Sequence, residues 1–235
     1  MLPFVSVTMI RVQVNQAVCD IQLARPTRLN ALTLASTQAL LEAVREARRD
    51  DAVRALLLSG EGRAFCAGKD RDDPAGPEFV ALLQALAEAL MDCPKPVVAA
   101  VHGWAVGAGL ELLLNCDLVL AARGARFMLP ETHLGLFGTG GVAALLPRQA
   151  GLGRAKGILM LGEAFGAAQA EQWGLVWAVL EDEAALHAEA RRVARRLAGA
   201  DPALMGRLKA ALHREAVGDL QGVLAREADI HWQMR

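Results

Sequence analysis

The stretch KPVVAAVHGWAVGAGLELLLNCDLVLA at residues 95–121 decides the fold of this chain. Proline lacks a backbone N–H and restricts the residue before it, so Lys95-Pro96 ends any preceding helix. The following residues predict three elements in succession: a buried strand over 97–101, a turn over the glycine-spaced residues 102–109, and a buried helix over 110–114. A second buried strand is predicted over residues 117–121.

The order strand, glycine turn, helix leaves backbone N–H groups without partners at the start of the helix. Such groups bind an anion, or stabilise an oxyanion that forms during a reaction. Glu111 lies in the first turn of the predicted helix, and Glu131 follows in a second glycine-rich stretch, PETHLG. On the residues alone, a structural role stays open for both glutamates. The helix dipole favours a carboxylate in a first turn, and a loop glutamate after proline is ordinary.

Composition limits the possible partners of the protein. The chain has 235 residues, 54% of them hydrophobic, and a formal net charge of -1. That size fits one large domain or a core with an appendage. The charge does not favour a nucleic acid or a membrane surface as the main partner. Residues 1–10 show no signal peptide, and no apolar run reaches the ~18 residues expected of a membrane span.

The cysteines point to a reducing compartment. They are widely spaced and form no C-x-x-C pair, so the sequence shows no metal or redox motif of that kind. We expect them to be reduced core residues of a cytoplasmic protein. They are Cys19, Cys66, Cys93 and Cys116.

Strands and helices alternate along the first part of the chain, and helices alone follow. This alternation predicts an α/β core, and on pattern alone it favours a doubly wound sheet. Strands are predicted over residues 9–14, 17–23, 53–59, 64–67, 97–101, 117–121 and 175–180. Helices are predicted over residues 34–49, 78–91, 110–114, 141–151, 154–161, 167–173, 183–197, 202–217 and 219–234.

Four local stretches match a known family, in the family's own order. They are Arg25-Pro26 with Leu29-Asn30-Ala31-Leu32, AFCAGKD at 64–70, residues 95–121, and Pro130-Glu131 with Gly135 and Gly140-Gly141. Together they resemble the crotonase, or enoyl-CoA hydratase/isomerase, superfamily over residues 11–217. The resemblance implies an α/β fold built as a spiral of ββα units instead of a doubly wound sheet.

The resemblance also implies a division of the chain. Residues 1–181 would form the crotonase spiral core, and residues 182–235 a C-terminal helical region that mediates trimer contacts. We therefore expect a homotrimer or a dimer of trimers. Within one chain the apolar faces of these last helices have little to pack against. The residues on these faces include Leu186, Val193, Leu197, Leu204, Leu208 and Leu212.

By resemblance, the backbone N–H groups of Lys69 and Ala108 form an oxyanion hole for a thioester carbonyl. The turns at Gly68 and Gly107 would present them. Two aimed N–H groups stabilise the negative charge of an enolate without having to reorganise. The Lys69 side chain would either reach the nucleotide part of the ligand or face water.

By resemblance, Glu111 and Glu131 occupy the positions of the catalytic carboxylates of family hydratases. Hydration of a 2-enoyl-CoA needs one group that deprotonates water and one that supplies a proton at Cα. The predicted function is therefore an enoyl-CoA hydratase. The alternatives are an enoyl-CoA isomerase that uses mainly Glu131, and a non-catalytic crotonase-fold protein for assembly or RNA binding. The charge argues against RNA, and the retained carboxylate pair argues against lost catalysis.

The remaining predicted contacts are to coenzyme A, which is part of the substrate, so no separate cofactor and no metal is expected. Arginines suit phosphate groups, although solvated loop arginines are an equal alternative. Trp104 would line an acyl channel or lie in the core, and His102 and His133 are expected to be structural. The predicted CoA and substrate contacts are Arg25, Arg28, Gly68, Asp70, Arg71 and Gly107.

Overall fold

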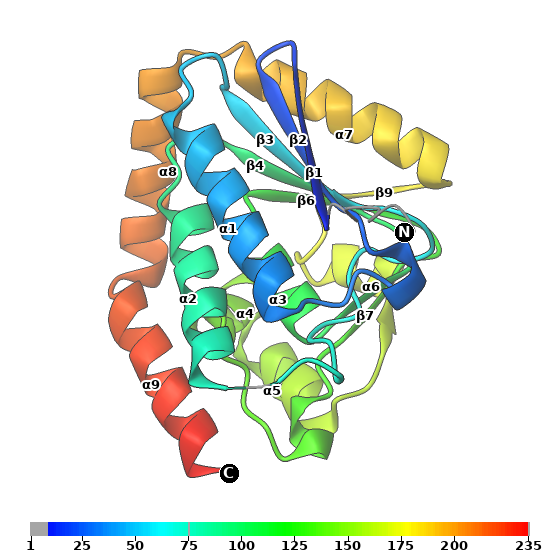
Figure 1. Ribbon diagram of the computed structural model, residues 1–235, viewed down its shortest axis with the longest axis vertical. Helices are drawn as coiled ribbons and strands as arrows, with labels where there is room; N and C mark the ends of the chain where they lie inside the picture. The colour runs from blue at the N-terminus through cyan, green and yellow to red at the C-terminus, as the bar shows by residue number, and fades with distance from the viewer. Residues whose placement is uncertain (1–8, 75, 235) are drawn as a thin grey trace, which may run out of the picture.

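A six-stranded sheet forms the centre of the protein (Figure 1). The computed structural model describes residues 9–74 and 76–234. The prediction that residues 1–10 contain no signal peptide therefore falls mostly outside the described residues. The first two strands pair antiparallel and all later neighbours pair parallel. In spatial order the strands are β1 (Ile10–Asn15), β2 (Val18–Leu23), β3 (Ala55–Gly60), β4 (Val97–Val101), β6 (Leu118–Ala122) and β9 (Ala178–Leu180).

A second, three-stranded sheet is interleaved with the first along the chain. Its strands are β5 (Trp104–Val106), β7 (Arg126–Met128) and β8 (Phe165–Gly166). β4 of the large sheet leads into β5 and then into a helix, and Cys66, which follows β3, forms a bridge to Ala105 of β5. The strand order of the large sheet advances without reversal, so the ββα spiral is confirmed and the doubly wound alternative is wrong.

The helices surround the two sheets. All the predicted helices are present, with ends shifted by no more than two residues. They are α1 (Leu34–Arg49), α2 (Pro77–Met91), α3 (Ala108–Leu114), α4 (Val142–Ala150), α5 (Leu152–Leu161), α6 (Ala167–Gln172), α7 (Glu183–Ala198), α8 (Pro202–Val217) and α9 (Leu220–Gln233). Short 3-10 helices cover Pro26–Arg28 (η1) and Glu131–Leu134 (η2). The predicted strand over 64–67 is reduced to the single bridge at Cys66.

Helices cover both faces of the large sheet. In β3, Leu56 and Leu58 point to the face under α1 and α2, whereas Ala55 and Leu57 point to α7, because successive strand residues alternate between faces. α7 lies along that second face in Figure 1 and packs Leu186 there with no exposed surface. The expectation that this apolar face lacks a partner within the chain is therefore wrong for α7. The boundary after residue 181 stays a prediction.

α8 is attached by a buried ion pair. Lys209 Nζ lies 2.7 Å from Asp117 Oδ2 and donates to the Leu90 carbonyl at 2.9 Å, and the residue is 7% exposed. The same Asp117 oxygen accepts a hydrogen bond from the Val97 N–H at 2.7 Å. The pair thus joins α8 to the start of β4 and to the loop before β6.

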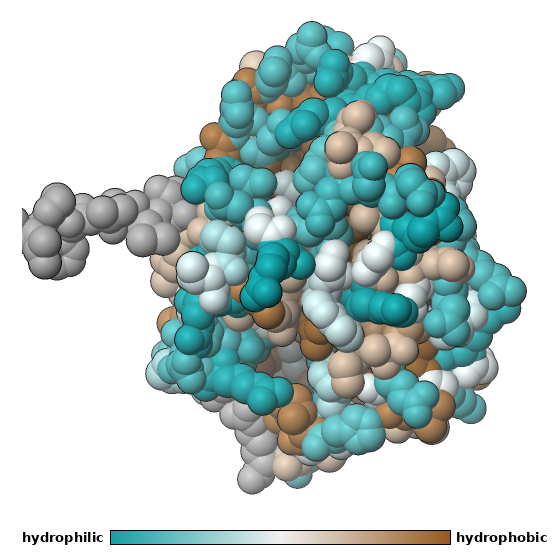
Figure 2. Space-filling view, turned by 90° about the vertical axis from the view of Figure 1, so that its right-hand side faces the viewer, coloured by the Kyte–Doolittle hydropathy of each residue, from teal (hydrophilic) through white to brown (hydrophobic). Residues whose placement is uncertain are grey.

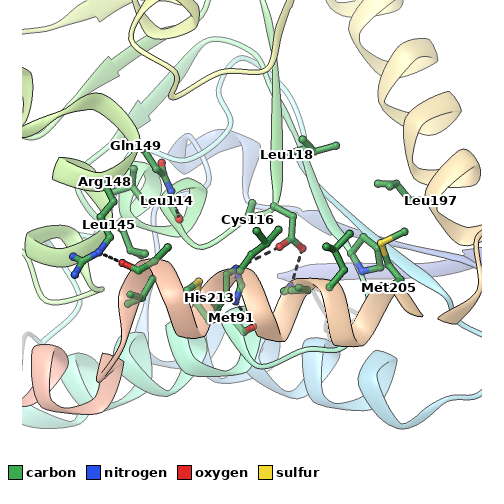
Figure 3. A pocket seen from close by; sticks show the side chains of 17 residues that line it. Met91, Leu114, Cys116, Leu118, Leu145, Arg148, Gln149, Leu197, Met205 and His213 are labelled. Atoms are coloured by element: carbon green, nitrogen blue, oxygen red, sulfur yellow. Dashed lines mark hydrogen bonds and ion pairs between the residues drawn. The ribbon is translucent and has the colours of Figure 1, made fainter. Parts of the chain in front are cut away.

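A hollow of about 380 Å³ lies beside this ion pair (Figure 3). Figure 3 shows His213 and Met205 of α8 on one side of it and Leu114, Cys116 and Leu118 on the other. Leu208 and Leu212 of α8 also line the hollow and, with Leu204, form an exposed apolar edge of the helix. Although this hollow is larger than the cavity at the two predicted glutamates, the two share no lining residue.

The outer surface is mostly hydrophilic on the face shown in Figure 2, where hydrophobic side chains are scattered between polar ones. Within the described ranges, no helix has the length and apolar character needed to cross a bilayer.

Replacing Lys209 by methionine should lower the free energy of unfolding by about 3 kcal/mol, because removal of one partner leaves Asp117 uncompensated. The measurement is chemical denaturation at neutral pH. Lys156→Met, at an exposed position of α5, is the matched control and should change stability by less than about 0.5 kcal/mol. Equal stabilities of the two variants would contradict this assignment.

Candidate active site

A cavity of about 190 Å³ collects residues from distant parts of the chain. It lies between α2, the turn that begins α3, η2 and the end of α9. Seven of the predicted site residues are among its lining: Gly68, Lys69, Arg71, Gly107, Ala108, Glu111 and Glu131. The other lining residues are mainly apolar and include Phe79, Val80, Leu83, Leu136, Phe137 and Trp232. Such a mixture suits an apolar ligand that carries one reacting polar group.

Backbone pairing places the two predicted N–H donors in the same wall. Val106 donates to the Cys66 carbonyl at 3.0 Å, and Cys66 donates to the Trp104 carbonyl at 3.0 Å. The residues that follow these two segments are therefore neighbours. Ala108 is the first residue of α3, and helical geometry leaves its N–H without a partner inside the helix.

Two glycines allow this close approach. A Cβ at Gly68 would lie 2.7 Å from the Val106 carbonyl oxygen and 3.8 Å from Ala108 N. Gly107 has a φ of 51°, which side chains disfavour, and a Cβ there would lie 2.8 Å from Glu131 Oε1. Glycine is therefore needed at both turns for the N–H groups and Glu131 to share one cavity.

Glu111 is fully enclosed and held by backbone donors. The residue is 3% exposed, and its Oε2 accepts hydrogen bonds from the N–H groups of Thr139, at 3.0 Å, and Gly140. Burial raises the pKa of Glu111 well above its ordinary value. The charges of Glu131 and Glu227 raise it further, against the two hydrogen bonds. Glu111 therefore takes up a proton far more readily than an exposed glutamate.

Glu131 lies at the start of η2, and its Oε2 is buried without a hydrogen-bond partner among the described residues. Burial raises the pKa of Glu131 to about 7. Both protonation states are therefore populated near neutral pH. Two carboxylates of raised pKa in one cavity are suited to hold a single proton between them and to transfer it.

The predicted CoA contacts are only partly brought together. Arg25 Nη2 and Arg28 Nη2 each lie 3.0 Å from a different oxygen of Asp70, and Arg28 also pairs with Asp72. Burial of Asp70 opposes its ionisation, but hydrogen bonds led by that from Arg28 lower the pKa of Asp70 to about 2. These arginines and Asp70 are not among the described residues that line the cavity.

The Lys69 side chain folds back onto its own loop. Its Nζ donates to the carbonyls of Asp70 at 2.8 Å and Asp73 at 2.5 Å, and lies 5.3 Å from the centre of the Phe79 ring. The ammonium group therefore fixes the loop that follows the predicted oxyanion turn. Neither side-chain role expected from the sequence, reaching the ligand or facing water, describes this arrangement.

Three other residues of interest lie outside the cavity lining. Trp104 is 41% exposed on β5, so neither a core nor an acyl-channel position fits it. His102 donates to the Gly62 carbonyl at 2.7 Å, and His133 to the Leu161 carbonyl at 2.7 Å. Both histidines thus make structural contacts.

Two buried polar residues on α9, of which His231 lines the cavity, were missed by sequence reasoning. Glu227 is 1% exposed and His231 7% exposed, and His231 Nδ1 donates to the Phe137 carbonyl at 2.8 Å. Both follow Leu224 at helical spacing, so they occupy the apolar face of the helix. Polar residues at positions where an apolar stripe should continue were the available signal.

Comparison with known proteins agrees with this geometry. Residues 13–235 match the family model for enoyl-CoA hydratase/isomerase. The chain belongs to the enoyl-CoA hydratase/isomerase family. It is 39% identical over 226 residues to 1,2-epoxyphenylacetyl-CoA isomerase of Escherichia coli K12, covering 92% of this chain and 86% of that one. It is 37% identical over 231 residues to a probable enoyl-CoA hydratase of Rhodobacter capsulatus, covering 96% and 89%.

Solved structures agree as well. A crystal structure of an enoyl-CoA hydratase from Mycobacterium avium subsp. paratuberculosis superposes with a TM-score of 0.90 at 33% identity, covering 97% of this chain and 90% of that one. The protein is therefore an enzyme of the enoyl-CoA hydratase/isomerase superfamily with the crotonase fold. Relatives at similar identity carry both hydratase and isomerase names, so family membership alone leaves the reaction open.

In this enoyl-CoA hydratase/isomerase family member, the carboxylate of Asp70 holds the two arginines beside the predicted oxyanion turn. Asp70→Asn should lower the free energy of unfolding by about 2 kcal/mol at neutral pH, because a lowered folded-state pKa stabilises the ionised form. This contribution is present above the ordinary pKa and is lost as the pH falls toward about 2, so variant and wild type should converge in acid. Urea denaturation across that pH range measures it. Asp51→Asn, at an exposed position, should show no such convergence.

Proposed function

We propose that the protein is an enoyl-CoA hydratase that adds water to a 2-enoyl-CoA thioester. The observation that carries the proposal is the cavity in which Glu111 and Glu131 face the turns of Lys69 and Ala108. The residues that carry both predicted N–H donors and both predicted carboxylates line this one cavity. Hydration uses all four groups, whereas a single proton shift uses fewer of them.

The two glutamates would divide the reaction. Glu111 takes a proton from the bound water as its oxygen bonds to Cβ, and negative charge passes to the thioester oxygen. The N–H groups of Lys69 and Ala108 stabilise that charge. Protonated Glu131 then gives its proton to Cα, and the enolate returns to a thioester. The pKa of about 7 for Glu131 suits this exchange at neutral pH.

Either Glu111→Gln or Glu131→Gln should lower kcat for hydration by at least ~10², because glutamine keeps the shape and removes the proton-transfer group. Hydration of a 2-enoyl-CoA, followed by loss of the conjugated absorbance, measures this. Glu163→Gln, an exposed position outside the cavity, is the control. Hydration rates that remain at the wild-type level in both variants would mean that the two glutamates are structural.

Isomerisation of a 3-enoyl-CoA is the second candidate. It is favoured by the 39% identity to a protein named as a CoA-ester isomerase and by the unpartnered buried oxygen of Glu131. One carboxylate is enough to move a proton between two carbons. If wild type does not hydrate 2-enoyl-CoA, and Glu111→Gln still converts 3-enoyl-CoA at the wild-type rate, the protein is an isomerase.

Coenzyme A would enter as part of the substrate, without a separate cofactor. Arg71 is exposed and lines the cavity, so it is better placed for a phosphate than Arg25 and Arg28, whose charges are offset by Asp70. Among the described residues, no group of three or more His, Cys, Asp and Glu side chains could hold a metal ion.

We also propose that the chain assembles as a homotrimer or a dimer of trimers, through the exposed leucine edge of α8. Leu204 is 66% exposed, Leu208 50% and Leu212 61%, at successive helical turns. Light scattering at micromolar concentration should give at least the trimer mass, and Leu208→Lys should reduce it. A monomer for the wild type would refute this assembly.

A further inference from the structure

Glu227 is a buried carboxylate that the proposed reaction does not use. Its Oε2 accepts a hydrogen bond from the Gly141 N–H at 2.7 Å, and its Oε1 accepts one from the Ala143 N–H at 2.6 Å. Within the described ranges, no basic side chain bonds to it. Burying a carboxylate without a basic partner is costly. The two backbone N–H donors offset part of this cost for Glu227.

The same backbone segment binds Glu111. The N–H groups of Thr139 and Gly140 donate to Glu111 Oε2, and the next ones, of Gly141 and Ala143, donate to Glu227. Residues 139–143 thus distribute their donors between a carboxylate on α3 and a carboxylate on α9. Any displacement of this segment from Glu227 also displaces the donors of Glu111.

Glu227 caps α4 from another helix. The N-cap residue of α4, Gly141, has no side chain and a φ of 90°, which residues with side chains disfavour, so no local side chain accepts these donors. The structure uses a residue 86 positions further along the chain. One turn beyond Glu227, His231 donates a hydrogen bond to the Phe137 carbonyl. The helix α9 is therefore hydrogen-bonded to residues 137–143 through two of its side chains.

We propose that Glu227 is a positioning residue that locks residues 139–143, so that Oε2 of Glu111 stays bound while Oε1 remains available to the water that reacts. This inference rests on the proposed function, because it assigns Glu227 to the same two-glutamate site. Glu111 Oε1 accepts no hydrogen bond from a described residue, which leaves it available. Glu227 touches neither substrate nor water in this arrangement.

The charge of Glu227 also acts on Glu111 directly. Burial raises its pKa to about 7, and its charge contributes to the raised pKa of Glu111, after burial and Glu131. The other titratable groups of α9 and of the helices packed against it are bonded elsewhere, exposed or distant. Arg226, Asp229 and Glu78 are exposed, and Glu88 of α2 lies in a hollow beside Arg45 and Arg48. His231 donates to the Phe137 carbonyl, and Arg148 of α4 to the Ala144 and Ala216 carbonyls.

Glu227→Gln tests the proposal, because glutamine keeps the volume and one acceptor oxygen but removes the charge and one hydrogen bond. We expect kcat to fall by about 10- to 100-fold with little change in KM, since misplacement of a catalytic group affects the transition state more than substrate binding. The acidic limb of the kcat/KM profile should move to lower pH, because loss of a negative neighbour lowers the pKa of Glu111.

Asp229→Asn is the matched control. It removes one negative charge from the exposed side of the same helix and should leave kcat and the acidic limb unchanged. A Glu227→Gln enzyme with wild-type kcat and an unmoved limb would overturn the proposal. A loss of thermal stability with an unmoved limb would also overturn it, because Glu227 would then serve the fold alone.

A readout without turnover separates this inference from the proposed function. Infrared titration of the carboxyl groups should show that the pKa of Glu111 is lower in Glu227→Gln than in wild type, whichever reaction is catalysed. An unchanged titration would refute the inference even if hydration is confirmed. If Glu227→Gln does not fold, Glu227→Asp tests the hydrogen bonds alone, because it keeps the charge and displaces them; kcat should fall, and the pKa of Glu111 should rise as its own donors move away. Failure of both variants to fold would assign Glu227 to the fold and overturn the positioning role.

Discussion

The structure depends on backbone N–H groups that secondary structure leaves unpaired. At the start of α3 they face the cavity, and at the start of α4 they hold two buried carboxylates. A helix start exposes such groups in any protein. What distinguishes this fold is that two helix starts and two glycine turns converge, so that unpaired donors and buried acceptors lie within one small volume.

Much of this arrangement could be predicted from local sequence. Pro96, the apolar run after it and Gly107 specify a strand, a turn and a helix within a few residues, and local spacing places Glu111 in the first helical turn. The short strand β5 was missed because its three residues lie inside the glycine-spaced stretch that predicts a turn. The spiral order of strands came from the family resemblance, since periodicity carries no information about which strands are neighbours.

The contacts that were not predicted join residues far apart in the chain. Glu227 meets the start of α4, and Lys209 meets Asp117 only after the whole spiral has formed. The pairing of Arg25 and Arg28 with Asp70 also depends on the bridge between Leu32 and Lys69, which no local pattern reveals. For α7, the sequence showed an apolar face, but the identity of the surface that covers it depends on the sheet.

The position of α9 has a consequence for motion. This helix supplies His231 and Trp232 to the cavity lining, and it contacts α2, which also lines the cavity, and α4, whose first N–H groups Glu227 holds. Local opening of a helix is a free-energy difference that amide hydrogen exchange measures residue by residue. Here the opening of α9 would simultaneously hydrate the cavity and release the donors of Glu111, so ligand entry and the proton affinity of the site are governed by a single equilibrium.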